Sequence, residues 1–215
     1  MKTILYVTIL LFVTTFKPIT YQKTKFIINH GDIKLSLDND TCTFISEHNI
    51  KWKDFQKLNS DRKDRWHNEK PNGPYNKEHY NNSGYDLGHL TPAHITSYND
   101  TLQYHSFSMF NQAPQLAGFN RGKWKKMELG VEDTISKYKS DVRIITGVVY
   151  DNNKKIYLSK SRIKIPTYFY KIISIEKENK TYVWLGSNLN GNVIKINIIY
   201  LNEILKKYNN RLTFK

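Results

Sequence analysis

The sequence is poor in cysteine, because Cys42 is the only one among its 215 residues. A single cysteine cannot form a disulfide within the chain, so stability must come from a hydrophobic core or a bound metal rather than from cross-links. The sequence also has no internal repeat, no Pro- or Ser-rich linker and no low-complexity tract. With 39% hydrophobic residues, a chain of this length is expected to form one domain around one core.

Long hydrophobic runs are also missing after residue 20, so no later segment is apolar enough to span a bilayer. The first residues contain Lys2, an apolar run from Ile4 to Val13, and then polar and small residues. This pattern predicts a secretory signal peptide at 1–20 and a single domain at 21–215 that is secreted or periplasmic, without stable membrane association. A buried N-terminal helix and an uncleaved anchor remain the alternatives.

Acidic residues are scarce relative to basic ones. There are 19 Asp and Glu against 33 Lys and Arg, which gives a formal net charge of +14. Such an excess raises the local concentration of polyanions, and DNA and RNA are the commonest polyanions available. A solvated, lysine-rich surface from an AT-rich genome explains the same composition, so charge alone leaves nucleic-acid binding open.

Hydrophobic periodicity predicts a mixed α and β protein. Three short strands are expected at 25–29, 33–37 and 42–46, and longer strands at 142–150, 164–175 and 181–187. Apolar residues at helical spacing, from Trp124 to Tyr138, predict a helix that begins near Asn120, and a short final helix is expected at 200–208. The polar stretch 59–84 is predicted to be a long surface loop.

The segment GYDLGHLTPAH, residues 84–94, places His89 between Gly88 and Leu90. Gly88 permits backbone angles that other residues avoid, and Pro92 biases the residue before it away from helix. His89 is therefore expected at a turn or a strand end. That position suits an imidazole presented to a cleft, and it also suits a plain structural turn.

Asn120 stands where the predicted helix begins, so its side-chain oxygen could cap the helix or coordinate a cation. Glu128 follows eight residues later, about 12 Å along a regular helix. If Asn120 binds a metal, Glu128 would reach the same ion through water. The structural alternatives are an ordinary N-cap for Asn120 and an exposed helix charge for Glu128.

Five short motifs in one order resemble a known family. They are Asp86, Gly88 and His89; Asn111, Pro114 and Gln115; Asn120, Trp124 and Glu128; Thr146 and Gly147; and Pro166 and Thr167. This series is similar to that of the DNA/RNA non-specific endonucleases, the ββα-metal group that includes mitochondrial endonuclease G and secreted bacterial nucleases. The resemblance implies an α+β fold with a mainly antiparallel central sheet flanked by helices.

The resemblance also implies the chemistry. His89 would be the general base that takes a proton from the attacking water, since an imidazole can accept a proton near neutral pH. Asn120 would be the single direct protein ligand of Mg²⁺, or of Mn²⁺ in its place, and Glu128 would orient water on that ion. The expected reaction is hydrolysis of phosphodiester bonds in DNA and RNA that leaves 5′-phosphate ends.

An arginine that contacts the scissile phosphate is expected upstream of the histidine motif, beside an aromatic residue. Arg62 and Arg65 are the candidates, and Arg65 is favoured because it adjoins Trp66. Asp86 and Asn111 are the remaining substrate-binding candidates. A homodimer is also expected by analogy with related nucleases, although one sequence does not locate the dimer surface.

The sequence departs from the family pattern at Leu87, where the motif Asp-Arg-Gly-His has arginine. The base and the metal ligand are retained, so activity is expected, and a non-catalytic protein that binds nucleic acid or another polyanion is the alternative. A zinc site is a weaker alternative, because the spacings of the candidate histidines match no common metal signature. Those histidines are His79, His89, His94 and His105.

Overall fold

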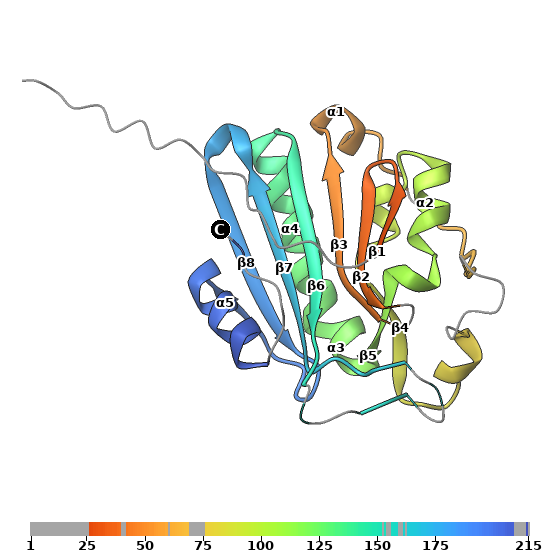
Figure 1. Cartoon of the computed structure of the whole chain (residues 1–215). Helices are drawn as coiled ribbons and strands as arrows, with labels where there is room; N and C mark the ends of the chain where they lie inside the picture. The colour runs from red at the N-terminus through yellow and green to blue at the C-terminus, as the bar shows by residue number, and fades with distance from the viewer. Residues whose placement is uncertain are drawn as a thin grey trace, which may run out of the picture.

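The computed structural model describes residues 26–39, 42–59, 61–68, 76–151, 153, 156–158, 161, 163–208 and 214; the predicted signal peptide lies outside these ranges. Strands form one antiparallel sheet of seven in the order β1-β2-β3-β6-β7-β8-β9 (Figure 1). Their bounds are β1 Phe26–His30, β2 Ile33–Asn39, β3 Cys42–Ile50, β6 Val142–Val149, β7 Tyr168–Ile175, β8 Lys180–Ser187 and β9 Val193–Ile196. The predicted α+β class with a mainly antiparallel sheet is confirmed.

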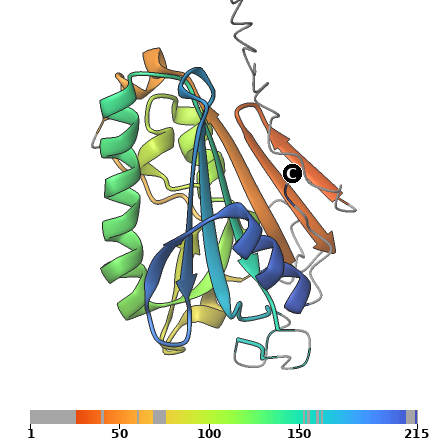
Figure 2. The same ribbon diagram turned by 90° about the vertical axis from the view of Figure 1, so that its left-hand side faces the viewer.

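Helices cover both faces of the sheet, and the two faces follow from the alternation of side chains along the strands. In β6, Ile144 packs in a cluster with Val131 of α4 (Lys125–Tyr138). The next residue, Ile145, packs in a second cluster with Leu201 of α5 (Ile198–Lys207). Figure 2 shows α4 and α5 on opposite sides of the sheet.

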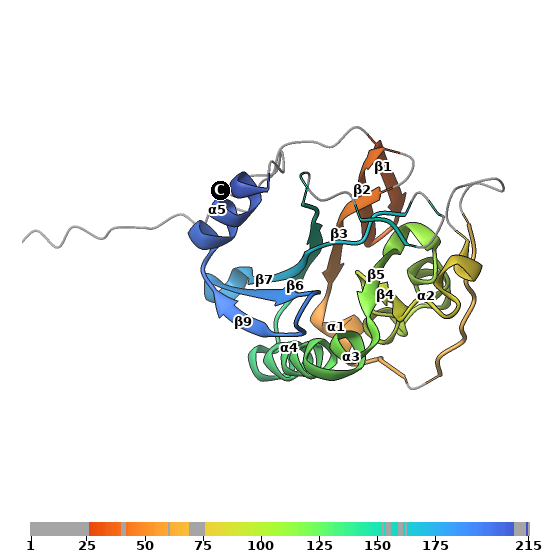
Figure 3. The same ribbon diagram turned by 90° about the horizontal axis from the view of Figure 1, so that it is seen from below.

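The residues between β3 and α4 form a second, smaller group of elements beside the sheet. Its elements are α1 Trp52–Phe55, η1 Lys77–Tyr80, β4 Tyr85–His89, η2 His94–Thr96, α2 Asp100–Ser106, η3 Met109–Asn111, β5 Gln112–Leu116, α3 Ala117–Phe119 and η4 Asn120–Trp124. Strands β4 and β5 form a separate two-stranded antiparallel sheet. Figure 3 shows this pair beside α2 and α3. Two antiparallel strands followed by a helix are the arrangement that the predicted ββα fold requires.

The long helix begins earlier than predicted. It starts with α3 at Ala117, passes through the π-helical turn η4 and continues as α4. The prediction that Asn120 stands at the N-terminus of this helix is therefore wrong. Asn120 has helical angles (φ −55°, ψ −54°), and its side chain is directed to Asp86 instead of capping the helix. The irregularity lies at Gly122 (φ −103°, ψ −111°), which divides the helix at the site.

The predicted surface loop at 59–84 is only partly a loop. Trp66 packs against a core cluster, His67 pairs with Ser108 in a short β-bridge, and η1 ends the segment, while 69–75 lie outside the described residues. The structure also contains β4, β5, β9 and α2, which the sequence pattern did not predict. No helix in the described ranges is long and apolar enough to cross a membrane.

Candidate active site

His89 is the last residue of β4, where the sequence predicted a strand end or a turn, and it pairs with Gln112 of β5. The preceding glycine permits close contact between the two strands. A Cβ on Gly88 would lie 2.5 Å from Gln115 Oε1 and 2.9 Å from the Ala113 carbonyl oxygen. Gly88 is therefore required by packing, and this packing fixes the backbone next to His89.

The His89 imidazole is enclosed by aromatic rings. Its centroid lies 4.9 Å from that of Trp66 and 5.1 Å from that of Phe107, which meets it edge-on. Its Nε2 atom is buried and has no hydrogen-bond partner among the described residues. Burial, and then the positive charge of Arg62, lowers the pKa of His89 to about 3. The ring is therefore neutral at pH 7, with a nitrogen available to accept a proton.

Arg62 is the candidate arginine whose charge acts on His89. Its guanidinium carbon lies 5.4 Å from the centroid of Phe107, the ring that also contacts His89, and its Nε donates to Asp64 at 2.6 Å. Arg65 is exposed. The geometry therefore favours Arg62 over the predicted Arg65 as the arginine beside the base.

Asp86 joins β4 to the π-helical turn η4 of the long helix. Its Oδ2 accepts a hydrogen bond of 2.9 Å from Asn120 Nδ2, and Arg121 donates to both of its carboxylate oxygens at 2.9 and 2.6 Å. Burial would raise the pKa of the Asp86 carboxyl, but the bonds from Arg121 and Asn120 outweigh it and hold the pKa below its usual value. Asp86 therefore positions Asn120, and its contact with substrate stays a prediction.

Glu128 is held by a buried lysine of the sheet. Lys171 Nζ of β7 donates to Glu128 Oε1 at 3.0 Å, and the Lys171 side chain is 2% exposed. The same ammonium lies 5.5 Å from the centroid of the Trp124 ring. Burial raises the pKa of Glu128, and the charge and hydrogen bond of Lys171 offset part of that rise. The carboxylate is thus fixed in one direction rather than being an exposed helix charge.

Asn111 lies in the interior and has no exposed surface. Its Oδ1 accepts from the Thr91 backbone N–H at 3.0 Å, and its Nδ2 donates to the carbonyl oxygens of Thr91 and Ser106, each at 2.8 Å. Its polar atoms are therefore used within the protein. This geometry does not support the predicted substrate contact, and instead Asn111 fastens the chain that follows His89 to α2.

Leu87 stands two residues before His89 in β4, so both side chains project from the same face of the strand. Leu87 and Tyr85 pack against the cluster that contains Tyr80 and Phe110. The position that has arginine in the family motif is therefore apolar and supported by apolar neighbours. The positive charge that acts on His89 is that of Arg62.

The donor atoms at Asn120 fit magnesium. Its amide nitrogen is occupied by Asp86, and nothing in the described part of the chain donates to its Oδ1. A carbonyl oxygen is a ligand that Mg²⁺ accepts, and this ion keeps several of its own waters. No group of three or more His, Cys, Asp or Glu that could hold a metal occurs in the described ranges. The four histidines of the zinc alternative lie on four elements, η1, β4, η2 and α2.

Comparison with known proteins decides the family. The sequence pattern of the DNA/RNA non-specific endonucleases matches residues 15–211. The chain belongs to the DNA/RNA non-specific endonuclease family. This match confirms the resemblance that the short motifs indicated. Members of the family are metal-dependent phosphodiesterases.

Individual relatives agree with this family. The mitochondrial nuclease of Saccharomyces cerevisiae is 36% identical over 109 residues, which are 45% of this chain and 33% of the yeast protein. Human mitochondrial endonuclease G is 27% identical over 118 residues, which are 48% of this chain and 39% of the human protein. The matched part thus spans only about a third of the length of these nucleases.

A solved structure of an endonuclease of this family shows the same fold. It is the crystal structure of the EndoG/EndoGI complex, whose title concerns the mechanism of EndoG inhibition. The TM-score is 0.63 at 22% identity, and the match covers 84% of this chain and 83% of the other. The two chains therefore share a fold.

Two charged residues of this endonuclease site were not predicted from its sequence. Arg121 follows Asn120 in a run of basic residues, and nothing in that run distinguishes the residue that pairs with Asp86. Lys171 left a clearer signal, because it is a single charge in the otherwise apolar strand YFYKIISI. A lysine in a buried strand is almost always paired, which is the observation that would have pointed to Glu128.

Proposed function

We propose that this chain is a secreted, Mg²⁺-dependent endonuclease that hydrolyses phosphodiester bonds of DNA and RNA with little sequence preference and leaves 5′-phosphate ends. Family membership supports the reaction class, and the apolar N-terminal run supports export. The single observation on which the mechanism rests is the partly exposed, neutral imidazole of His89 beside the charge of Arg62. Asp86, three residues before His89 in β4, binds Asn120, so the same strand carries the base and anchors the proposed metal ligand.

In this mechanism His89 accepts a proton from the water that attacks phosphorus. A phosphate placed near the ring would raise the pKa of His89 from its low value, because a negative charge favours the imidazolium. Proton acceptance would then be most favourable when substrate is bound. Arg62 is placed to contact phosphate oxygens, for which a planar guanidinium has the right geometry.

Asn120 would hold the magnesium ion through Oδ1, and Asp86 and Arg121 keep that amide in place. When bound, the ion would supply Lewis-acid stabilisation of negative charge at phosphorus and at the leaving 3′-oxygen. Glu128, fixed by Lys171, would orient water at the site. The described part of the chain contains no module that would make specific contacts with base edges. Affinity would therefore come from contacts with the phosphates.

Leu87 favours one alternative, a binding protein that has lost catalysis. An apolar residue on the same strand face as His89 removes the cation that the family motif supplies. The two functions differ in what His89 does. It is required for cleavage in an endonuclease, and it is dispensable in a binding protein.

Incubation of the protein with supercoiled plasmid and with RNA, with and without Mg²⁺, tests the proposal. We expect Mg²⁺-dependent degradation of both polymers, and we expect the His89→Ala variant to lose more than 100-fold in rate. Salt-sensitive binding of DNA by the variant should persist, and cooperative urea unfolding should show that the variant is folded. Failure of the folded parent protein to cleave with any divalent cation would overturn the nuclease proposal in favour of the binding protein.

A further inference from the structure

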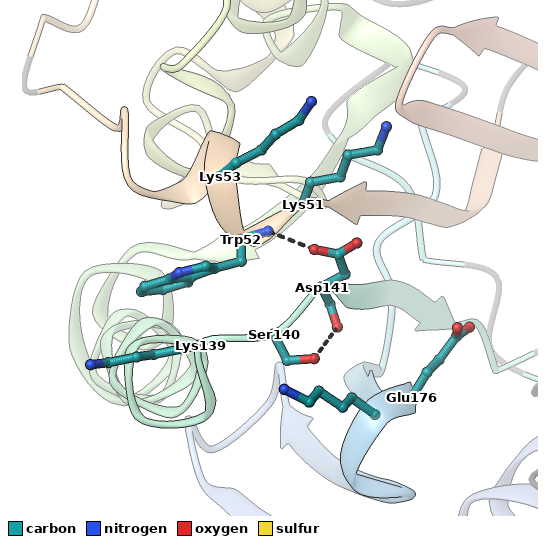
Figure 4. Close-up of a pocket in the computed structure, with 8 residues that line it drawn as sticks. Lys51, Trp52, Lys53, Lys139, Ser140, Asp141 and Glu176 are labelled. Atoms are coloured by element: carbon teal, nitrogen blue, oxygen red, sulfur yellow. Dashed lines mark hydrogen bonds between the residues drawn. The ribbon is translucent and has the colours of Figure 1, made fainter.

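A second concave site lies away from His89, at the other end of α4. It is a cavity of about 730 Å³ bounded by α1, by the connection from α4 to β6, and by the turn after β7 (Figure 4). Ligand pockets in proteins span roughly 300–1,000 Å³. Figure 1 shows α1 at the top of the molecule and α3 with the β4–β5 pair at the bottom. The cavity is therefore separate from the active site.

The lining of the cavity is rich in unpaired positive charge. Four lysines line it, namely Lys51, Lys53, Lys139 and Lys177. Within the described part of the chain, none of these four ammonium groups is paired with a carboxylate, whereas nearby Lys57 and Lys180 are. The lining has two carboxylates, and Asp141 already accepts the Trp52 backbone N–H at 2.8 Å. An excess of unneutralised cations around a cavity attracts an anionic ligand.

The directions of the lysine side chains favour an extended anion over a compact one. Figure 4 shows Lys51 and Lys53 pointing to one side of the site and Lys139 to the opposite side. A single phosphate ion would need cations that converge on one point. Cations spread across a cavity match successive phosphates of a strand that crosses it.

Trp52 adds an aromatic wall between these cations. The indole is only partly buried and stacks on Phe55, with ring centroids 5.7 Å apart. Unpaired bases stack on aromatic side chains, and a positively charged groove with aromatic rings is the usual surface for single-stranded nucleic acid. Single-stranded nucleic acid uses both kinds of group, the lysines through its phosphates and the ring through its bases.

We propose that this cavity, the α1–α4 exosite, binds a single-stranded segment of nucleic acid away from the cleaved bond. The inference rests on the proposed function, because the strand it binds is the nuclease substrate. Along α4, Glu128 and Lys139 are about 16 Å apart at ~1.5 Å per residue. At about 3.4 Å per nucleotide, a strand must extend roughly five nucleotides beyond the scissile phosphate to reach the exosite.

Binding is measured in EDTA with the His89→Ala protein and a fluorescein-labelled, mixed-sequence 30-nucleotide DNA strand. Adding Lys139→Gln and Lys177→Gln should weaken binding about tenfold at 0.1 M salt. The slope of log K against log salt concentration should also become smaller by about 1.4, because each of the two lost phosphate contacts contributes ~0.7. The pair Lys51→Gln and Lys53→Gln on the other rim should have the same effect. The control pair Lys206→Gln and Lys207→Gln removes equal charge from α5, on the opposite face of the sheet.

Equal losses in the exosite and control variants would overturn the proposal, because general charge would then explain binding. Weaker binding of heparin with unchanged binding of the oligonucleotide would also overturn it, in favour of a polysaccharide. In the catalytically intact protein, the exosite pair should slow cleavage of the 30-nucleotide strand but not of a four-nucleotide strand. Absence of all cleavage contradicts the proposed function alone, since the binding assay still decides the exosite.

Discussion

Lys171 is the residue on which the position of Glu128 depends. Removing the ammonium would leave a carboxylate partly buried and unpaired, so we expect Lys171→Met to lower the free energy of unfolding by about 3 kcal/mol. Urea unfolding of the variant and the parent protein measures this loss.

The double variant Lys171→Met with Glu128→Gln provides the control for charge. It removes both members of the pair. Its loss in unfolding free energy should be clearly smaller than the sum of the losses in the single variants Lys171→Met and Glu128→Gln. A strictly additive result would mean that the 3.0 Å contact between the two side chains contributes nothing.

Residue positions were predicted well where they follow from local backbone preferences and poorly where they follow from burial. His89 lies at a strand end, as its flanking Gly88 and Pro92 indicated. Asn111 had no signal of its burial, because an asparagine in a motif looks the same whether its amide is exposed or enclosed. Its three hydrogen bonds to Thr91 and Ser106 arise from tertiary contacts.

Among the elements, the β4–β5 pair is the most sensitive to a change of volume. Gly88→Ala would place a Cβ 2.5 Å from Gln115 Oε1 and 2.9 Å from a backbone oxygen. We expect a loss of about 1–3 kcal/mol in unfolding free energy, and a lower cleavage rate because His89 shifts with the strand.

Gly130→Ala is the matched control for Gly88→Ala. Gly130 lies in α4, and nothing lies within 4 Å of the Cβ it would gain. The change should therefore raise the unfolding free energy by roughly 0.5–1 kcal/mol, the helix preference for Ala over Gly. Urea unfolding and plasmid cleavage of both variants, measured together, check the pair, and equal stabilities would contradict the packing argument.

Elements of the main sheet were predicted, whereas those of the site were not. The three short strands and the strands that became β6, β7 and β8 have the apolar, β-branched composition that a buried sheet requires. Strands β4 and β5 contain Gly88 and Pro114, which weigh against a strand. They are compatible here because each strand of a two-stranded sheet is an edge strand. Only the pairing of β4 with β5, which are separate in the sequence, shows that both are edge strands.

At the scale of the whole molecule, two histidines with depressed pKa values make stability depend on pH. Burial, followed by the charge of Lys171, lowers the pKa of His48 to about 3, and His89 has a similar value. The unfolded chain binds these protons from about pH 6.5 downward, and the folded protein does not. Stability is therefore fully present above pH 6.5 and is lost as the pH falls toward 3.

For His48, which is 1% exposed, this loss amounts to about 2 kcal/mol between pH 7 and pH 5. The variant His48→Gln does not titrate there. Urea unfolding measures the unfolding free energy of both proteins at pH 7 and at pH 5. The decrease between these pH values should be about 2 kcal/mol smaller in the variant than in the parent, whatever the stability of the variant at pH 7. An identical decrease in both proteins would rule out His48 as a source of acid sensitivity.

The overall topology of the chain separates the sheet from the candidate active site. Strands β3 and β6 are direct neighbours in the sheet, yet the chain between them, 51–141, contains His89, Asn120 and Glu128. Pairing of β3 with β6 joins the two parts of the sheet, and none of the seven strands comes from this excursion. The end of the excursion, α4, nevertheless packs on the sheet, because Val131 shares a core cluster with Ile144. Substitutions in the loops and in the β4–β5 pair can therefore change the candidate site while β3 stays paired with β6, whereas the sheet-facing side of α4 is tied to the core.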